Sequence, residues 1–198
     1  MSAGFAVEVA AAAARLIVEE GMEYGPAKRR AALVLGRSRV RNGGLPDNDA
    51  VEAHVRAYLA LFCAETQPAE LAALRCIARE WMERLAEFRP HLAGAVWRGT
   101  ATRHNDVHLQ LFCDDSKSAE IALINQGVEY HVGSKAGLRR DSVDVLSVAS
   151  KCVELDEWVT VHLAVHDLDD LRGALKPDTS GRTQRGDLAA LQKLEERE

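Results

Sequence analysis

The sequence lacks the features that mark several classes of protein. Within its 198 residues, no apolar run approaches the roughly 18 to 20 residues that a membrane-spanning helix needs, so we expect no membrane partner. Four cysteines occur without a Cys-x-x-Cys pair, which favours buried free thiols in a reducing cytoplasm over disulfides or a zinc site. The alanine-rich start also lacks the basic leader of a signal peptide. These absences together predict a cytoplasmic protein.

Other absences argue against particular kinds of chemistry. No Gly-x-Gly-x-x-Gly follows a strand pattern, and no Gly-x-x-x-x-Gly-Lys-Ser/Thr occurs, so neither a dinucleotide-binding fold nor a P-loop is indicated. A Gly-x-Ser-x-Gly nucleophile elbow is missing as well. The formal net charge of −5 argues against general coating of nucleic acid, but it leaves room for a local basic patch.

One segment is a candidate for such a patch. Residues 28–41 hold six basic residues and no acid. The segment is either a solvated helix face and loop, or a surface that contacts the phosphates of a nucleotide or an RNA.

Apolar spacing and turn residues divide the chain into two parts. Before residue 90, helical spacing predicts helices at 5–20, 26–36, 49–66 and 68–88. After it, alternation predicts strands at 94–97, 106–111, 128–132, 142–148 and 158–165, with helices at 117–126 and 168–175. We therefore expect an α+β protein: a helical N-terminal segment over 1–68, a mixed sheet with packed helices over 69–175, and a flexible linker with a short helix over 176–198.

The stretch from Gly94 to Leu111 carries the most specific pattern. It begins as a short apolar segment, passes through a glycine-containing turn, and continues as an alternating strand. Side chains two residues apart on a strand point to the same face. Asp106, His108 and Gln110 should therefore share one face, with apolar residues on the other.

This stretch resembles the signature of the nucleotidyltransferase superfamily, which includes DNA polymerase beta and the small bacterial "minimal" enzymes. The signature is a hydrophobic residue, Gly, Gly or Ser, about ten residues, and then Asp-hydrophobic-Asp/Glu-hydrophobic. The residues in register are Gly94, Arg98, Gly99, Thr100, Ala101, Asp106, Val107 and Leu109. Two positions depart from it: Ala95 stands for the phosphate-contacting Ser or Gly, and His108 for the second carboxylate.

The resemblance implies transfer of a nucleoside monophosphate from an NTP to a hydroxyl acceptor. Such sites use two Mg²⁺ ions held by oxygen ligands. Asp106 would be the first ligand, and Asp144, in Ser-Val-Asp-Val-Leu on a later strand, is the candidate for the third. The simpler interpretations are a strand-start residue for Asp106 and a solvent-facing acid at the strand edge for Asp144.

His108 leaves the mechanism open, because imidazole is a poor ligand for Mg²⁺. The site could be inactive and kept for nucleotide or protein binding. It could use one Mg²⁺, or Mn²⁺ or another metal that accepts nitrogen. His108 could instead act as a general base toward the acceptor hydroxyl.

The resemblance also assigns a phosphate-contacting turn. Its backbone N–H groups, hydroxyl and positive charges would face a triphosphate; the residues concerned are Gly94, Arg98, Gly99, Thr100 and Arg103. Three further histidines, His131, His162 and His166, lie on other expected strands. Asp167 and Asp169 near the last make a second metal site conceivable, but no zinc spacing is matched and sheet-face histidines are the simpler interpretation.

Two functions remain at this stage. The chain is either a divergent nucleotidyltransferase, acting on a small molecule, RNA or protein, or an inactive module of the same fold for nucleotide sensing or protein interaction. Minimal members of the superfamily often work with a helical partner chain. A homo-oligomer or such a partner is therefore expected, unless the N-terminal helices take its place.

Overall fold

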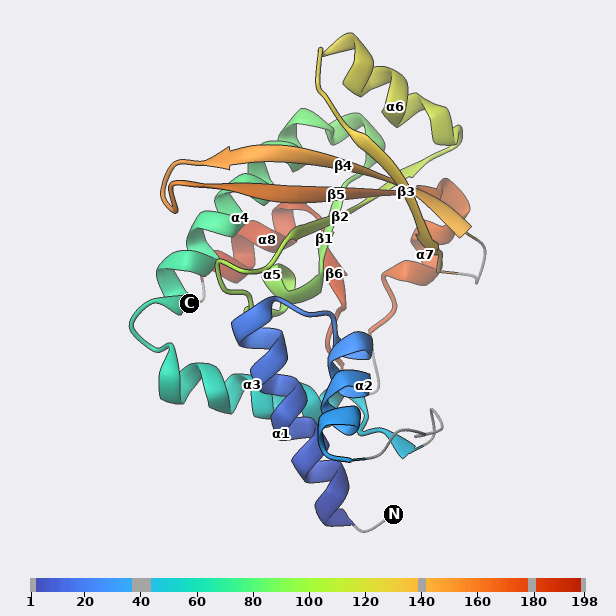
Figure 1. Cartoon of the computed structure of the whole chain (residues 1–198). Coiled ribbons are helices and arrows are strands. Elements are labelled where there is room, and N and C mark those ends of the chain that lie inside the picture. The colour runs from blue at the N-terminus through green and yellow to red at the C-terminus, as the bar shows by residue number, and fades with distance from the viewer. Residues whose placement is uncertain (1–2, 37–43, 139–141, 178–180, 197–198) are drawn as a thin grey trace. The chain divides into compact units, whose positions relative to one another are not determined.

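The structure is a computed structural model of the whole chain, and it describes residues 3–36, 44–138, 142–177 and 181–196 (Figure 1). The chain divides into two compact units. The helical unit comprises residues 1–70 and 100–105, and the sheet unit comprises residues 71–99 and 106–198.

Three helices build the helical unit: α1 (Ala3–Glu20), α2 (Tyr24–Val34) and α3 (Asn48–Phe62). The stripe Val9, Ala13 and Ile17 on α1 is at most 2% exposed, because residues four apart lie on one face of a helix. This stripe shares a core with small residues of α2 and with Val51 and Val55 of α3. The unit is thus a small helical core, as the apolar spacing predicts.

The loop 100–105 belongs to this helical unit. Thr102 Oγ1 donates to the carbonyl of Val18 at 3.2 Å, and Gln67 Nε2 donates to the carbonyl of Ala101 at 3.0 Å. Gly21, with φ +65°, lies directly beside the carbonyl of His104. The loop that precedes Asp106 is therefore packed against α1 rather than extended from the sheet.

The sheet unit contains one six-stranded sheet within the described residues, in the order β3-β4-β5-β2-β1-β6. Its strands are β1 (His91–Ala93), β2 (Val107–Cys113), β3 (His131–Ala136), β4 (Ser142–Cys152), β5 (Glu157–Asp167) and β6 (Arg185–Gly186). The central pair β2–β5 is parallel, and the other pairs are antiparallel. The predicted α+β class, with helices preceding a mixed sheet, is confirmed.

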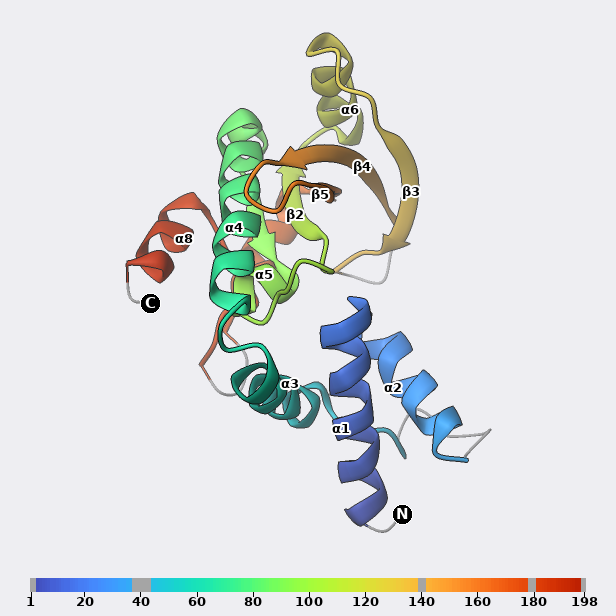
Figure 2. The same cartoon turned by 60° about the vertical axis from the view of Figure 1, so that its left-hand side comes forward.

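Helices surround this sheet. They are α4 (Gln67–Arg84), the 3-10 turn η2 (Ala86–Phe88), α5 (Gly94–Arg98), α6 (Ser116–Asn125), η3 (Leu168–Asp170), α7 (Leu171–Ala174) and α8 (Leu188–Glu195). α6 contacts β2 and β5, and α8 contacts β1 and β6. Arg79 of α4 pairs with Glu195 of α8. In Figure 2, α4 and α8 lie on one side of the sheet, while β3 and β4 curve away from them.

The two faces of the sheet differ in chemistry. One face is apolar: Leu109 and Leu111 of β2 and Val161 and Leu163 of β5 are all fully buried. Directly paired residues share a face, so the opposite face carries His108 and Gln110 of β2 with their β5 partners. We call this second side the polar face.

Several predicted elements differ from the structure. Residues 94–97, expected as a strand, form the short helix α5, because the left-handed φ of +75° at Gly94 ends β1 after three residues. The strand expected at 128–132 begins at His131. The predicted linker and helix over 176–198 contain β6 as well as α8, and both contact β1. None of the described helices is long and apolar enough to cross a membrane.

Candidate functional site

A row of polar side chains crosses the middle of the polar face. The strand register places His131 of β3 opposite Ser147 of β4, Ser147 opposite His162 of β5, and His162 opposite His108 of β2. Since directly opposed residues point to the same side of a sheet, these four side chains share one face. Asp106, two residues before His108, joins them at the start of β2.

Three of these groups form a hydrogen-bonded chain. Nε2 of His162 lies 3.0 Å from Oδ2 of Asp106, and Nδ1 of His162 lies 2.8 Å from Oγ of Ser147. An ionised carboxylate can only accept, so Nε2 carries the hydrogen. In the neutral ring Nδ1 is then the acceptor, and the hydroxyl of Ser147 donates to it. Asp106 thereby fixes the tautomer in which His162 can take a proton from Ser147.

His108 packs against this chain. Its ring stacks on that of His162, with centroids 4.9 Å apart and planes inclined by 18°. A Cβ at Gly94 would lie 3.3 Å from Cδ2 of His108, and Gly94 has φ +75°. Glycine at this position therefore serves both the left-handed turn after β1 and the close approach of that turn to His108.

The hydrogen-bonded chain of Asp106, His162 and Ser147 is reachable from solvent. The side chain of Asp106 is 47% exposed and that of His162 is 25% exposed, while Ser147 is half-buried. A ligand could thus contact the acid and the imidazole without a change of fold. The sequence did not predict His162 or Ser147 as site residues. The alternation in 158–165 only places His162 on the same face as Thr160.

The structure does not bring Asp144 to this site. Asp144 and Ser147 are three residues apart on β4, so their side chains point to opposite faces of the sheet. Asp144 is on the face of the buried Leu146 and Val148. Its carboxylate lies 3.6 Å from Nζ of Lys117 on α6. The expected convergence of Asp106, His108 and Asp144 is wrong, because the Val-Asp-Val pattern specifies an alternation but not the face to which it points.

The donor set on the polar face does not fit a pair of magnesium ions. Mg²⁺ requires oxygen ligands in near-octahedral geometry, whereas Asp106 is accompanied here by the imidazoles of His108 and His162. In the part of the chain that the structure describes, no three His, Cys, Asp or Glu side chains are placed to hold a metal ion together. We therefore derive no step through a protein-held metal.

The residues expected to form the phosphate-contacting turn are divided between the units. Gly94, Arg98 and Gly99 belong to the sheet unit, and Thr100 and Arg103 to the helical unit. Thr100 is 1% exposed, and the backbone N–H of Arg103 donates to Glu70 at 3.1 Å. Within the helical unit Thr100 is thus buried, and the N–H of Arg103 anchors the loop to Glu70.

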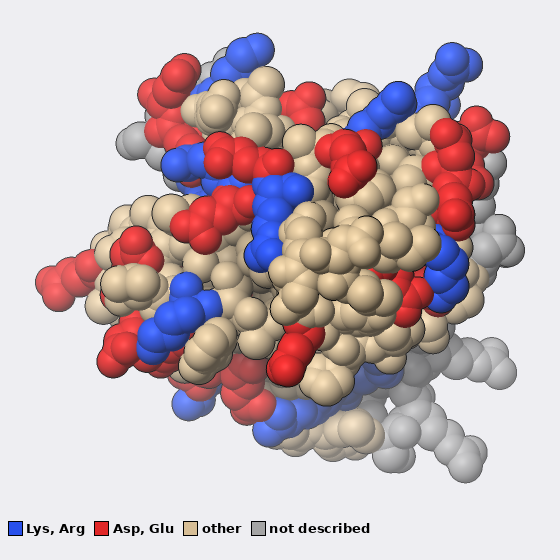
Figure 3. All heavy atoms as spheres, turned by 90° about the horizontal axis from the view of Figure 1, so that it is seen from above, with Lys and Arg blue, Asp and Glu red and all other residues tan. Residues whose placement is uncertain are grey.

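The basic segment 28–41 is described only in part. Nζ of Lys28 donates to Asn48 at 2.8 Å, and Arg30 pairs with Glu20. Arg37, Arg39 and Arg41 lie outside the described residues. On the surface in Figure 3, the Lys and Arg side chains lie interspersed with Asp and Glu.

No protein-family model matches the chain, and no curated protein is significantly similar to it. The resemblance to nucleotidyltransferases therefore rests on the motif quoted above.

Proposed function

We propose that the polar face of the sheet binds a nucleoside triphosphate and transfers its nucleotidyl group to a hydroxyl activated by the Asp106–His162 pair. The hydrogen bonds of His162 to Asp106 and to Ser147 carry this proposal. The motif resemblance supplies the substrate class. The proposed mechanism differs from the one that the resemblance implies: an imidazole held by a carboxylate would take the place of a metal-bound carboxylate pair.

The hydroxyl that His162 now contacts is that of Ser147. In the proposed step, Oγ of Ser147 forms a bond to the α-phosphorus, and the bond from that phosphorus to the bridging oxygen of pyrophosphate breaks. The proton of Ser147 passes to Nδ1 of His162, and Asp106 stabilises the imidazolium through Nε2. Pyrophosphate leaves. An external acceptor hydroxyl could later attack the same phosphorus and restore Ser147.

Acyl hydrolysis fits this arrangement less well. An acyl-transfer serine needs N–H donors directed at the developing oxyanion. Ser147 lies inside β4, which pairs with β3 on one side and with β5 on the other. Backbone N–H groups beside it serve the sheet ladders. Phosphoryl chemistry can instead draw on cationic side chains.

The second candidate is a nucleotide-sensing module without catalysis. It is favoured by the presence of a single carboxylate, Asp106, beside the two stacked imidazoles. In either case Mg²⁺ or Mn²⁺ would arrive with the triphosphate. The cytoplasmic location is likewise a proposal. It is supported by the four cysteines, all of which are free thiols in the structure.

Nucleotide titration and pyrophosphate release test the two candidates together. Each NTP is titrated calorimetrically with Mg²⁺, Mn²⁺ or no metal into the wild type, Asp106→Asn, His162→Gln and the control His131→Gln. His131 lies in the same row but on the exposed edge strand. Loss of the general base His162, or of the carboxylate that orients it, should lower pyrophosphate release about 10²- to 10⁴-fold in Asp106→Asn and His162→Gln, and not in His131→Gln.

Binding that depends on Asp106 without release of pyrophosphate would favour the sensing module. The absence of binding by every NTP would rule out both candidates.

A further inference from the structure

A cavity of about 720 Å³ opens beside η3 and α7 in the sheet unit. Its lining includes three leucines and three cations: Leu168, Leu171, Leu175, Arg89, Arg172 and Lys176. Asp169 is the one acid among the described lining residues, so the lining carries three positive charges and one negative charge, a net charge of +2. The whole chain, by contrast, carries a net charge of −5. A positive cavity of this size is suited to a small anionic ligand.

The three leucines form one wall of the cavity. Leu168, Leu171 and Leu175 are spaced by three and four residues, so their side chains lie on one face of η3 and α7. Leu168 and Leu171 are half-buried, and Leu175 is 43% exposed. Because the removal of apolar surface from water is favourable, this wall favours a ligand with an apolar body over one that is polar throughout.

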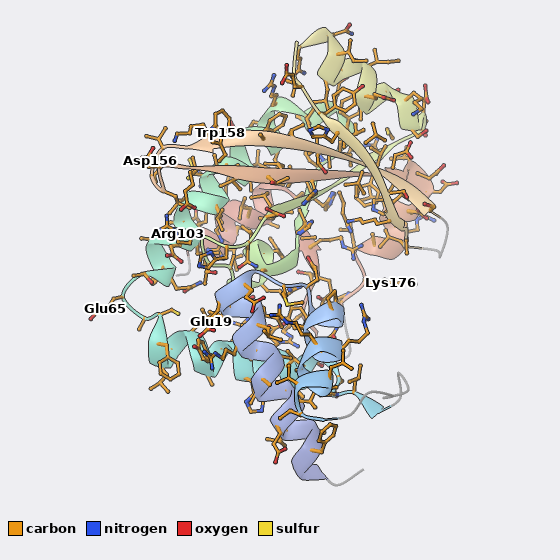
Figure 4. All side chains as sticks on the ribbon, viewed as in Figure 1. Glu19, Glu65, Arg103, Asp156, Trp158 and Lys176 are labelled. Atoms are coloured by element: carbon orange, nitrogen blue, oxygen red, sulfur yellow. The ribbon has the colours of Figure 1, made fainter. Side chains whose placement is uncertain are left out.

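Cationic side chains border this wall from two parts of the chain. Arg172 and Lys176 each follow a leucine of the wall by one residue and are four residues apart, so they lie side by side on its flank. Lys176, labelled in Figure 4, follows α7. Arg89 comes from a distant part of the sequence and directly follows η2. Two separate elements therefore contribute positive charge to the same cavity.

The backbone of Arg89 is strained and firmly held. Its φ of +48° lies in the left-handed region, which costs a residue other than glycine about 1–2 kcal/mol. Its N–H donates to the carbonyl of Ala86 at 3.1 Å, and its own carbonyl accepts from Nδ1 of the buried His91 at 2.8 Å. Strained residues persist where the surrounding structure holds them, and they cluster at functional sites. Such support is expected of a residue that presents its side chain to a ligand.

The charges of the three cations are not neutralised by the protein. In the part of the chain that the structure describes, no hydrogen bond or ion pair engages the side chain of Arg89, Arg172 or Lys176. Other cations of the sheet unit have acidic partners: Lys117–Glu120, Lys151–Asp156 and Arg79–Glu195. Like charges around one cavity repel one another, and an anion bound among them would relieve that repulsion. The cavity therefore combines an anion-binding rim with an apolar wall.

We propose that this cavity binds an alkyl phosphate, that is, a phosphate monoester of an apolar alcohol. Arg89, Arg172 and Lys176 hold the phosphate, whose oxygens match guanidinium donors, and the leucine wall holds the alkyl chain. The net charge of +2 on the lining matches a phosphate monoester, which carries about −1.5 to −2 near pH 7, more closely than it matches a carboxylate. Neither Asp106 nor His162 lines the cavity, so this binding does not depend on the proposed nucleotidyl transfer.

An alkyl phosphate could come from two sources, as a free molecule or as the head of phosphatidic acid in a bilayer. The concave shape of the site favours the free molecule, because its alkyl chain enters the protein. A helix that binds a bilayer must instead project its apolar face outward into the lipid. The experiment below separates the two sources.

Calorimetry tests the site with octyl phosphate, octanoate and inorganic phosphate, each below its micelle concentration. The proteins are the wild type, Arg89→Gln, Arg172→Gln and the control Lys193→Gln, which removes an exposed cation of α8 that does not line the cavity. All three positions are exposed, so the variants should fold. We expect octyl phosphate to bind the wild type more tightly than either other probe. Each arginine variant should weaken that binding about tenfold, and Lys193→Gln should leave it unchanged.

Two further measurements test the apolar wall and the source of the ligand. Leu175→Ala should weaken binding of octyl phosphate about fivefold and leave binding of inorganic phosphate unchanged. The wild type should not sediment with phosphatidylcholine vesicles that contain phosphatidic acid. Absence of octyl phosphate binding, equal affinities of the wild type and both arginine variants, or octanoate binding as tight as that of octyl phosphate would overturn the proposal. Sedimentation with the vesicles without binding of octyl phosphate would also overturn it, in favour of a membrane surface.

Discussion

Gly21 offers a sharp test of the packing of the loop 100–105. A Cβ at this position would lie 2.0 Å from the carbonyl oxygen of His104, in a residue with φ +65°. Gly36 in the same unit has φ +84° but no atom within 4 Å of its Cβ position. The pair Gly21→Ala and Gly36→Ala therefore shares the backbone penalty and differs in the clash.

The magnitudes follow from these two terms. A left-handed alanine costs about 1–2 kcal/mol, and this is the whole effect expected for Gly36→Ala. At Gly21 the loop backbone must also move by more than an ångström to make room, and forced overpacking adds about 1–3 kcal/mol. We therefore expect Gly21→Ala to lower the free energy of unfolding by about 2–5 kcal/mol.

Urea unfolding measures both effects. Trp81, Trp97 and Trp158 all belong to the sheet unit, so tryptophan fluorescence follows that unit, while circular dichroism at 222 nm follows the helices of both. Gly21→Ala should shift the dichroism transition farther than Gly36→Ala does. Equal shifts would refute the packing of the loop against the helical unit and would return Thr100 and Arg103 to consideration as phosphate ligands.

Three further predictions concern single side chains. His166 has a folded-state pKa of about 4, below its value near 6.5 in the unfolded chain, so the unfolded state binds more protons and stability is lost as pH falls through that window. The loss in the free energy of unfolding is about 2 kcal/mol by about pH 5. Urea unfolding near pH 7 and near pH 5 should show this loss in the wild type but not in His166→Gln. The same pH dependence in both proteins would contradict the burial of a neutral ring. Asp47 Oδ1 accepts from the N–H of Ala50 at 2.7 Å at the start of α3, so Asp47→Ala should lower the free energy of unfolding by about 1 kcal/mol in thermal or urea unfolding. A Cβ at Gly186 would lie 2.1 Å from Cη2 of Trp97, so Gly186→Ala should destabilise the sheet unit by about 1–3 kcal/mol and change the tryptophan emission, and an unaltered spectrum would contradict that contact.

The helices and the central strands were predictable because their apolar periodicity is strong. The stripe on α1 and the alternation in β2 and β5 each identify one face to bury, and these faces are buried in the structure. The short elements were harder to predict from the sequence. α5 covers the five residues Gly94–Arg98. It begins at one left-handed glycine and ends before another, Gly99, and its apolar sequence also suits a strand.

The site was only half predictable for a different reason. Asp106 and His108 are neighbours on one strand, so alternation alone places them together. The third member depends on which residue of β5 pairs with His108, and long-range register is not written in local sequence. His162 therefore took the place that a motif match had given to Asp144. The burial of the His166 ring was likewise hidden, because the local sequence does not show what packs over this end of β5.

The most direct test of the nucleotidyl-transfer proposal is to locate the nucleotide after reaction. The purified protein is incubated with each NTP and divalent metal without added acceptor, and its peptides are then mapped by mass spectrometry. We expect a nucleotidyl group on the peptide that contains Ser147, absent from Asp106→Asn and His162→Gln and retained in His131→Gln. An unmodified Ser147, or a label that persists without Asp106 and His162, would contradict the role assigned to this hydrogen-bonded chain.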